Sequence, residues 1–172
     1  MSKVFVAKFN LFSFIICILS ISLCSCNDDD SIVIPEGVLS IKKFSNKLET
    51  VLSDSEIKSF NIETKELNFN KLTIADIKHR INNLDTLLFY IGDEMMFSSI
   101  SIVATSSDGI FNYLSFIMDD SKCYLADGYP SLDTLGKNEE KNKKQREANA
   151  QKIKMEWDIF IEYLRQRGKI AK

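Results

Sequence analysis

The sequence predicts an α+β fold: an antiparallel sheet of about five strands, helices on one face, and a long C-terminal helix. Three observations lead to this prediction. Short apolar runs that alternate with period two are separated by turns rich in Gly, Asp and Asn. The last thirty or so residues carry an apolar stripe with helical spacing. The composition, 45% hydrophobic and 27% charged over 172 residues, fits one globular domain and excludes a disordered chain or a disulfide-dense scaffold.

The first half of the domain contains both kinds of pattern. Residues 38–52 space their apolar side chains closer to 3.6 than to 2, which predicts a short helix, with a strand as the alternative. Residues 60–69 alternate on either side of a turn at 63–65 and predict a hairpin. Thr73 and Asp76 resemble a capping box, so a short amphipathic helix is predicted over 74–83.

Two further strand pairs follow. Residues 86–91 and 96–103 are predicted strands on either side of Gly92-Asp93-Glu94, with a bulge at Ser98-Ser99. Residues 111–118 and 122–126 predict another hairpin, and an ordered loop is expected over 127–136.

The C-terminal helix has the clearest pattern. The charged run 137–147 is predicted to open it as a solvated first part. Its apolar face is formed by Ala150, Ile153, Trp157, Phe160, Ile161 and Leu164. Gly168 suits the position just beyond the end of the helix.

The N-terminus reads as an export signal. Lys3 and Lys8 precede an apolar run over 9–23 that is typical of a secretory signal peptide and shorter than a membrane-spanning helix. We therefore predict a signal peptide over 1–25, an acidic tether over 26–37, and a single α+β domain over 38–172.

The end of this signal resembles a bacterial lipobox. Leu23-Cys24-Ser25-Cys26 has Leu at −3, a small residue at −1 and the Cys that becomes the new N-terminus. Cys26 fits better than Cys24, which would put Leu23 at the cleavage position. We predict that Cys26 is acylated, since several acyl chains give stable membrane anchoring. The alternative is an ordinary signal peptide with an incidental pair of cysteines.

The residues after Cys26 strengthen the resemblance to lipoproteins. Asn27-Asp28-Asp29-Asp30-Ser31 resembles the export signal of surface-exposed lipoproteins in Bacteroidota-type bacteria. The stretches SEIKSFNIETKELNF, LLFYIGDEMMF, CYLADGYPSLD and NAQKIKMEWDIFIEYLRQRGKI resemble a family of small gut-bacterial lipoproteins of unknown function. The lipoprotein resemblance implies lipid anchoring at the outer membrane, facing the cell surface or alternatively the periplasm. It points to no particular activity and offers no catalytic residues. Residues 57–103 are also similar to the base of the periplasmic head domain of the SecD translocation protein, which bears on the fold only.

Few residues could carry out catalysis. The one His, His79, lies off the apolar stripe of its predicted helix and is expected to face solvent. Cys123 lies in a predicted strand and is expected to be a buried apolar residue. One His and one usable Cys argue against zinc, so no metal or cofactor is expected. A net charge of −2 argues against binding to nucleic acid.

Carboxylates are the plentiful reactive groups. They are Asp93 with Glu94, Asp119 with Asp120, Asp127, and Asp133. Paired acids can hydrolyse glycosides or bind calcium. The first two pairs lie at predicted turns, where Asp is favoured for backbone reasons, so a turn role is the better interpretation.

Asp127 and Tyr129, together with Phe111 and Tyr113, form a candidate edge for a ligand or protein partner. The alternative is a tight turn with Tyr129 against Trp157. The leading hypothesis is therefore a membrane-anchored lipoprotein with a non-catalytic domain that binds an unknown protein or glycan or supports an envelope complex. The rival is a small carboxylate-dependent hydrolase of glycans or peptides. A third hypothesis is an inhibitor or immunity-type protein with a protruding loop at 105–110 or 127–136.

Overall fold

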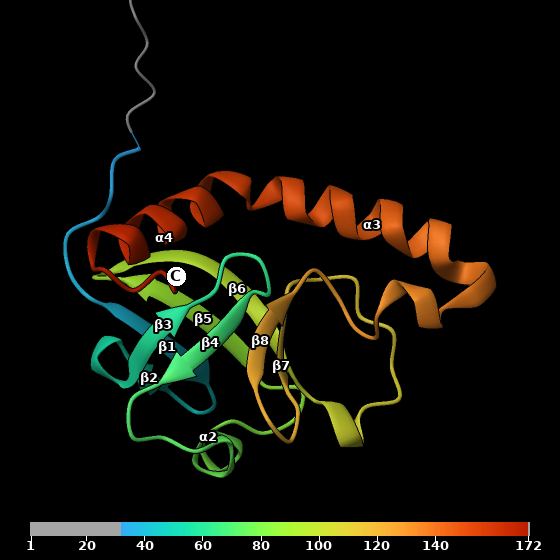
Figure 1. The fold of residues 1–172 in the computed structure, drawn as a ribbon, viewed down its shortest axis with the longest axis horizontal. Helices are drawn as coiled ribbons and strands as arrows, with labels where there is room; N and C mark the ends of the chain where they lie inside the picture. Colours follow the sequence, from blue (N-terminus) through green and yellow to red (C-terminus); the bar gives the residue numbers. More distant parts are fainter. Residues whose placement is uncertain (1–31, 172) are drawn as a thin grey trace, which may run out of the picture. The chain divides into compact units, whose positions relative to one another are not determined.

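The computed structural model describes residues 32–171 (Figure 1). The predicted signal peptide and Cys26 lie outside the described residues, so both stay predictions. Within 32–171, none of the helices is long and apolar enough to span a bilayer.

The domain is built on one eight-stranded mixed sheet, so the expected sheet of about five antiparallel strands is wrong. Its order is β2-β1-β5-β6-β7-β8-β4-β3, and only β6 and β7 pair in parallel. The strands are β1 (Leu39–Phe44), β2 (Leu48–Ser53), β3 (Ile57–Phe60), β4 (Glu66–Phe69), β5 (Thr86–Ile91), β6 (Glu94–Val103), β7 (Ser115–Met118) and β8 (Cys123–Ala126).

The sheet curls into a nearly closed barrel (Figure 1). Its two outermost strands, β2 and β3, are consecutive in the chain and are joined by a single 3-10 turn, Asp54–Glu56. The C-terminal tail pairs with the other edge of β3: the Phe60 N–H donates to the Lys169 carbonyl at 2.7 Å, and the Ala171 N–H donates to the Phe60 carbonyl at 2.8 Å. The end of this edge is therefore paired at Phe60, which shortens the open strand edge that another chain could use as a template.

The predicted helix over 38–52 is wrong, because this segment is the β1–β2 hairpin. Leu39 and Ile41 point into the core at alternate positions, as a strand requires. The apparent helical spacing came from Val38 and Phe44, which are 57% and 66% exposed. Exposed apolar residues carry no information about which face is buried.

Several other predictions are confirmed, with shifted bounds. β3 and β4 form the predicted hairpin, β5 and β6 are the predicted strands, and β7 pairs with β8. The helix α2 (Ile74–Arg80) begins with the predicted capping box of Thr73 and Asp76. The bulge opposite β5 falls at Met96 rather than at Ser98-Ser99, because Phe89 pairs with Phe97 and Tyr90 with Met95.

The C-terminal helix is two helices, α3 (Glu139–Lys152) and α4 (Lys154–Gln166), which meet at Ile153. The prediction that the helices lie on one face of the sheet is also wrong. In Figure 1, α4 lies across one side of the barrel and α2 lies at the opposite side. Phe160 of α4 enters an aromatic cluster, with ring centroids 5.3 Å from Phe97 and 6.0 Å from Phe89. This cluster places the core between α4 and the inner face of the barrel.

Candidate functional site

The candidate site lies outside the barrel, on the outer face of β7 and β8. Ile117 of β7 is paired with Tyr124 of β8, and both side chains point away from the core residues Phe116 and Leu125. The segment that follows β8 and the helix α3 lie beside this face, because both line one cavity with Ile117 and Tyr124. A cavity of about 720 Å³ remains between them.

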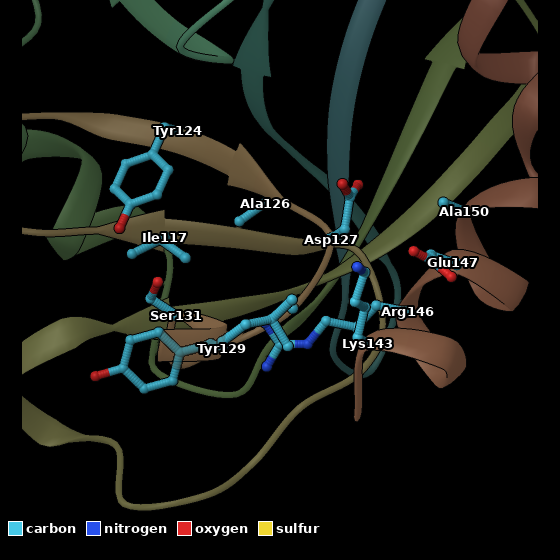
Figure 2. Close-up of a pocket in the computed structure, with 12 residues that line it drawn as sticks. Ile117, Tyr124, Ala126, Asp127, Tyr129, Ser131, Lys143, Arg146, Glu147 and Ala150 are labelled. Carbon is cyan, nitrogen blue, oxygen red and sulfur yellow. The ribbon is translucent and has the colours of Figure 1, made fainter. Parts of the chain in front are cut away.

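Figure 2 shows that the cavity is lined from three directions. The strands contribute aliphatic and aromatic side chains, the loop after β8 contributes polar and aromatic ones, and α3 contributes charged ones. The lining residues are Ile117, Tyr124, Ala126, Asp127, Gly128, Tyr129, Ser131, Leu132, Lys143, Arg146, Glu147 and Ala150. A second hollow of about 450 Å³ shares Asp127, Glu147 and Ala150 with the first and reaches Lys65 and Trp157. We call the two hollows together the α3 groove.

Arg146 is the most unusual residue of the α3 groove, because it is a cation that is only 6% exposed. Its Nε donates to Asn112 Oδ1 at 3.1 Å and its Nη2 donates to the Pro130 carbonyl at 2.8 Å. Within residues 32–171 it forms no ion pair. Burial lowers the pKa of Arg146, and the negative charge of Asp127 partly offsets this. A guanidinium remains charged under these conditions, so the groove contains a buried positive charge that only neutral oxygens contact.

Gly128 makes room for this arginine. A β-carbon at position 128 would lie 2.4 Å from Arg146 Nε and 2.4 Å from the Phe111 carbonyl oxygen. Any side chain there would displace the guanidinium or the backbone of the neighbouring loop. The Asp127-Gly128-Tyr129 segment is therefore shaped around Arg146.

α3 is attached to the domain through polar contacts. Its buried residues are Asn142 and Arg146. Asn112 Nδ2 donates to Asn142 Oδ1 at 2.6 Å, and Asn149 Nδ2 donates to the Asn112 carbonyl at 2.7 Å. The sequence prediction of a solvated run over 137–147 is wrong for Asn142 and Arg146, which are buried. The signal was present: Asn142, Arg146 and Asn149 recur at i, i+4 and i+7, on one face of a helix.

The structure brings three of the four predicted edge residues together. Phe111 and Tyr129 pair through two backbone hydrogen bonds of 2.7 and 2.8 Å, and Asp127 and Tyr129 both line the α3 groove. Tyr113 is 63% exposed and is not among the lining residues. The Tyr129 hydroxyl donates to the Ala104 carbonyl at 3.0 Å. Trp157, the alternative partner of Tyr129, instead joins the aromatic cluster of the core.

Asp127 is engaged by a lysine. Lys65 Nζ lies 2.9 Å from each oxygen of the Asp127 carboxylate. The same ammonium lies 5.4 Å from the centroid of the Trp157 ring, which adds a cation–π contact. Lys65 therefore neutralises the acid that stands at the junction of the two hollows.

The other candidate acids lie at turns or in ion pairs. Burial raises the pKa of Asp119, but the backbone N–H groups of Ser121 and Lys122 donate to its carboxylate and hold the pKa below its usual value. Asp120 pairs with Lys78 at 3.1 Å. The remaining acids are exposed: Asp93 and Glu94 at the β5–β6 turn, and Asp133 in the 3-10 turn Leu132–Thr134.

The two other candidate reactive groups lie outside the groove. Cys123 is fully buried in the barrel, as predicted, and burial raises the pKa of its thiol to about 12. His79 is exposed on α2, also as predicted. In the part of the chain that the structure describes, no three His, Cys, Asp or Glu side chains gather into a potential metal site.

Comparisons with known proteins found no relative of this chain. No protein-family model matches the chain, and no curated protein or solved structure matches it either. The resemblances to small lipoproteins and to the SecD head base therefore stay predictions.

Proposed function

We propose that this protein is a lipid-anchored envelope lipoprotein whose domain binds a ligand in the α3 groove without transforming it. Acylated Cys26 anchors the chain in the outer membrane, and the acidic tether holds the domain at the cell surface. The observation that carries the binding role is a concave groove whose larger hollow, about 720 Å³, contains the buried guanidinium of Arg146, which forms no ion pair within residues 32–171.

The lining of the groove supports binding. Ligand sites are typically concave and largely apolar, with a few converging polar groups. Here Ile117, Tyr124 and Leu132 supply apolar surface, and Ser131 and Arg146 supply polar groups. The volume suits a short oligosaccharide or peptide segment rather than a single ion.

The placement of the acids supports binding over hydrolysis. Glycoside hydrolysis needs two carboxyl groups across a cleft, and the acid among them needs a raised pKa. Two acids line the larger hollow of the groove, Asp127 and Glu147, and Asp127 is held by Lys65. Asp119 lies outside the groove and caps its own turn. Within residues 32–171, the carboxyl groups with a displaced pKa are Glu56, Asp76 and Asp119, and in each the pKa is lowered.

Protease shaving of intact cells tests the anchoring half of the proposal. Cells carry the wild-type chain or Cys26→Ala, and mass spectrometry reads the N-terminus. We expect wild type to be acylated at Cys26 and cleaved from outside. Acylation with protection from the protease would place the domain on the periplasmic side. An unacylated Cys26 would contradict the anchor itself.

A blocked groove tests the binding half. The full-length acylated protein, purified in detergent, is screened on glycan and peptide arrays beside Ala150→Trp, which fills the wall shared by both hollows. Met155→Trp is the matched control, because Met155 is exposed and lines neither hollow. We expect wild type and Met155→Trp to retain the same ligand and Ala150→Trp to lose it. Equal binding by all three proteins, or binding by none, would contradict the proposal.

A further inference from the structure

We infer that the α3 groove receives the carboxylate of an acidic saccharide on Arg146. This inference rests on the proposed function, because it takes the groove to be the ligand site. It adds the chemical class of the ligand and the residue that selects it.

The bonding of Arg146 is incomplete within residues 32–171. A guanidinium has five N–H donors, and two of them are used, by Asn112 and by the Pro130 carbonyl. Nη1 has no acceptor within residues 32–171. It is not fully enclosed by protein atoms either, so a ligand atom can reach it. Buried charges are normally paired, and a carboxylate is the partner that a guanidinium binds with two parallel hydrogen bonds.

The two hollows of the α3 groove share the acids Asp127 and Glu147 and differ in their cations. Arg146 and Lys143 line only the 720 Å³ hollow, together with Tyr124, Tyr129 and Ser131. Asp127 and Glu147 also border the 450 Å³ hollow, beside Lys65 and Lys154. In Figure 2 the Arg146 side chain extends toward the Tyr129–Ser131 segment, whereas Glu147 lies beside Ala150. An anionic group is therefore favoured beside Arg146 at the Tyr129 end. Lys143, which forms no ion pair in the described chain, is a second cation in the same hollow.

The backbone beside the groove favours a saccharide over a peptide. β8 is hydrogen-bonded on both sides, to β7 and to β4, so it offers no free edge to which a peptide strand can add. Recognition must therefore come from side chains. Tyr124 and Tyr129 provide flat apolar surface, and Ser131, Asp127 and Glu147 provide acceptors for hydroxyl groups. A hydroxylated ring that carries one carboxylate matches this set.

Calorimetric titration of the full-length acylated protein in detergent tests the inference. The probes are oligosaccharides of galacturonate, glucuronate and N-acetylneuraminate, each beside its carboxyl-reduced neutral form. We expect at least one acidic probe to bind about 10-fold or more tightly than its reduced form, because an arginine–carboxylate pair is lost on reduction. Arg146→Gln should weaken that probe about 10-fold and Lys143→Gln several-fold. Lys144→Gln, which removes a 72% exposed lysine from the same helix, should leave it unchanged.

Each other result overturns the inference in a distinguishable way. If acidic and reduced probes bind equally, or if Arg146→Gln and Lys143→Gln both bind fully, recognition of a carboxylate is refuted. The proposed binding of a sugar in the groove would then still stand. If the protein binds only peptides with a free C-terminal carboxylate, and Ala150→Trp blocks this binding, the saccharide is refuted as the ligand class. The proposed ligand-binding function would then still stand. If the wild-type protein binds no probe, both the inference and the proposed ligand-binding function are refuted. If circular dichroism shows that Arg146→Gln is unfolded, two other measurements test the inference. They are the binding by Lys143→Gln and the comparison of acidic with reduced probes on the wild type.

Discussion

The two C-terminal helices follow one another in the chain and are held by opposite kinds of interaction. α4 buries Phe160 and Leu164 completely in the barrel core. α3 buries Asn142 and Arg146 against polar groups of two loops. Apolar burial accumulates with area, whereas each hydrogen bond adds only about 1 kcal/mol net. The barrel with α4 is therefore the stable scaffold, and α3 with its loops is a weaker outer layer that contains the candidate site.

The largest expected effect is a loss of stability in the barrel with α4. Phe160→Ala removes a fully buried ring from the aromatic cluster and should lower the free energy of unfolding by about 3–5 kcal/mol. Urea titration followed by circular dichroism measures it. The same titration of Met155→Ala, an exposed position on α4, is the control and should change little. A loss below about 1 kcal/mol for Phe160→Ala would show that α4 is not part of the core.

A thiol reporter compares the two regions directly. Because burial raises the pKa of Cys123 to about 12, its thiolate is scarce at neutral pH, and alkylation should be about a thousandfold slower than for an exposed thiol. Lys144→Cys places a matched thiol on the exposed face of α3 and should react at the ordinary rate. Peptide mass spectrometry after iodoacetamide treatment measures both sites in one protein. Comparable rates in the folded protein would contradict the buried position of Cys123.

A smaller effect is expected for the outer layer. Arg146→Gln removes two hydrogen bonds between α3 and the loops and leaves Asn112 Oδ1 without its donor. The expected cost is about 1–3 kcal/mol for the attachment of α3, with little change in the barrel. Limited proteolysis should cut within 137–152 faster in this variant. A fall in global stability as large as that of Phe160→Ala would show instead that α3 and the barrel unfold together.

The smallest effect concerns the seam between β2 and β3. The Arg80 guanidinium and the Ser53 N–H donate to Glu56, and these bonds hold the pKa of Glu56 below its ordinary value of 4.5. The lowered pKa stabilises the folded protein above about pH 4.5, and this contribution disappears as the pH falls through the folded pKa. Glu56→Gln should therefore be less stable than wild type at neutral pH, by at most about 1 kcal/mol, and the difference should vanish in acid. Urea titrations at several pH values measure it; a difference that grows on acidification would contradict the assignment.

Local patterns predicted much of the scaffold, because they depend on neighbours in sequence. The capping box at Thr73, the turn at Gly92 and the alternation in β5 and β8 all specify structure without knowledge of distant contacts. The pairing of β6 with β7 is different. It is parallel and connected through residues 104–114, which carry no helical crossover pattern, so nothing local indicated it.

The candidate site could be predicted only in part for a similar reason. Tyr129 and Asp127 are candidates from the sequence because they join a predicted strand to a loop, where an aromatic side chain beside a rigid Pro can form a binding edge. Arg146 lies in a run of charges whose other members are exposed, and the pattern that could indicate its burial is the pair of asparagines at i−4 and i+3. Its burial depends on Gly128 and Asn112, which are distant in the chain.

Hydrogen exchange measured by mass spectrometry tests the central claim, that a weakly attached outer layer carries the groove on a stable barrel. We predict that the amides of α3 exchange at least about 10-fold faster than those of α4 and β5, and that Arg146→Gln accelerates α3 and residues 127–131 while leaving α4 unchanged. Uniform exchange across α3 and α4, with Arg146→Gln accelerating both equally, would contradict it.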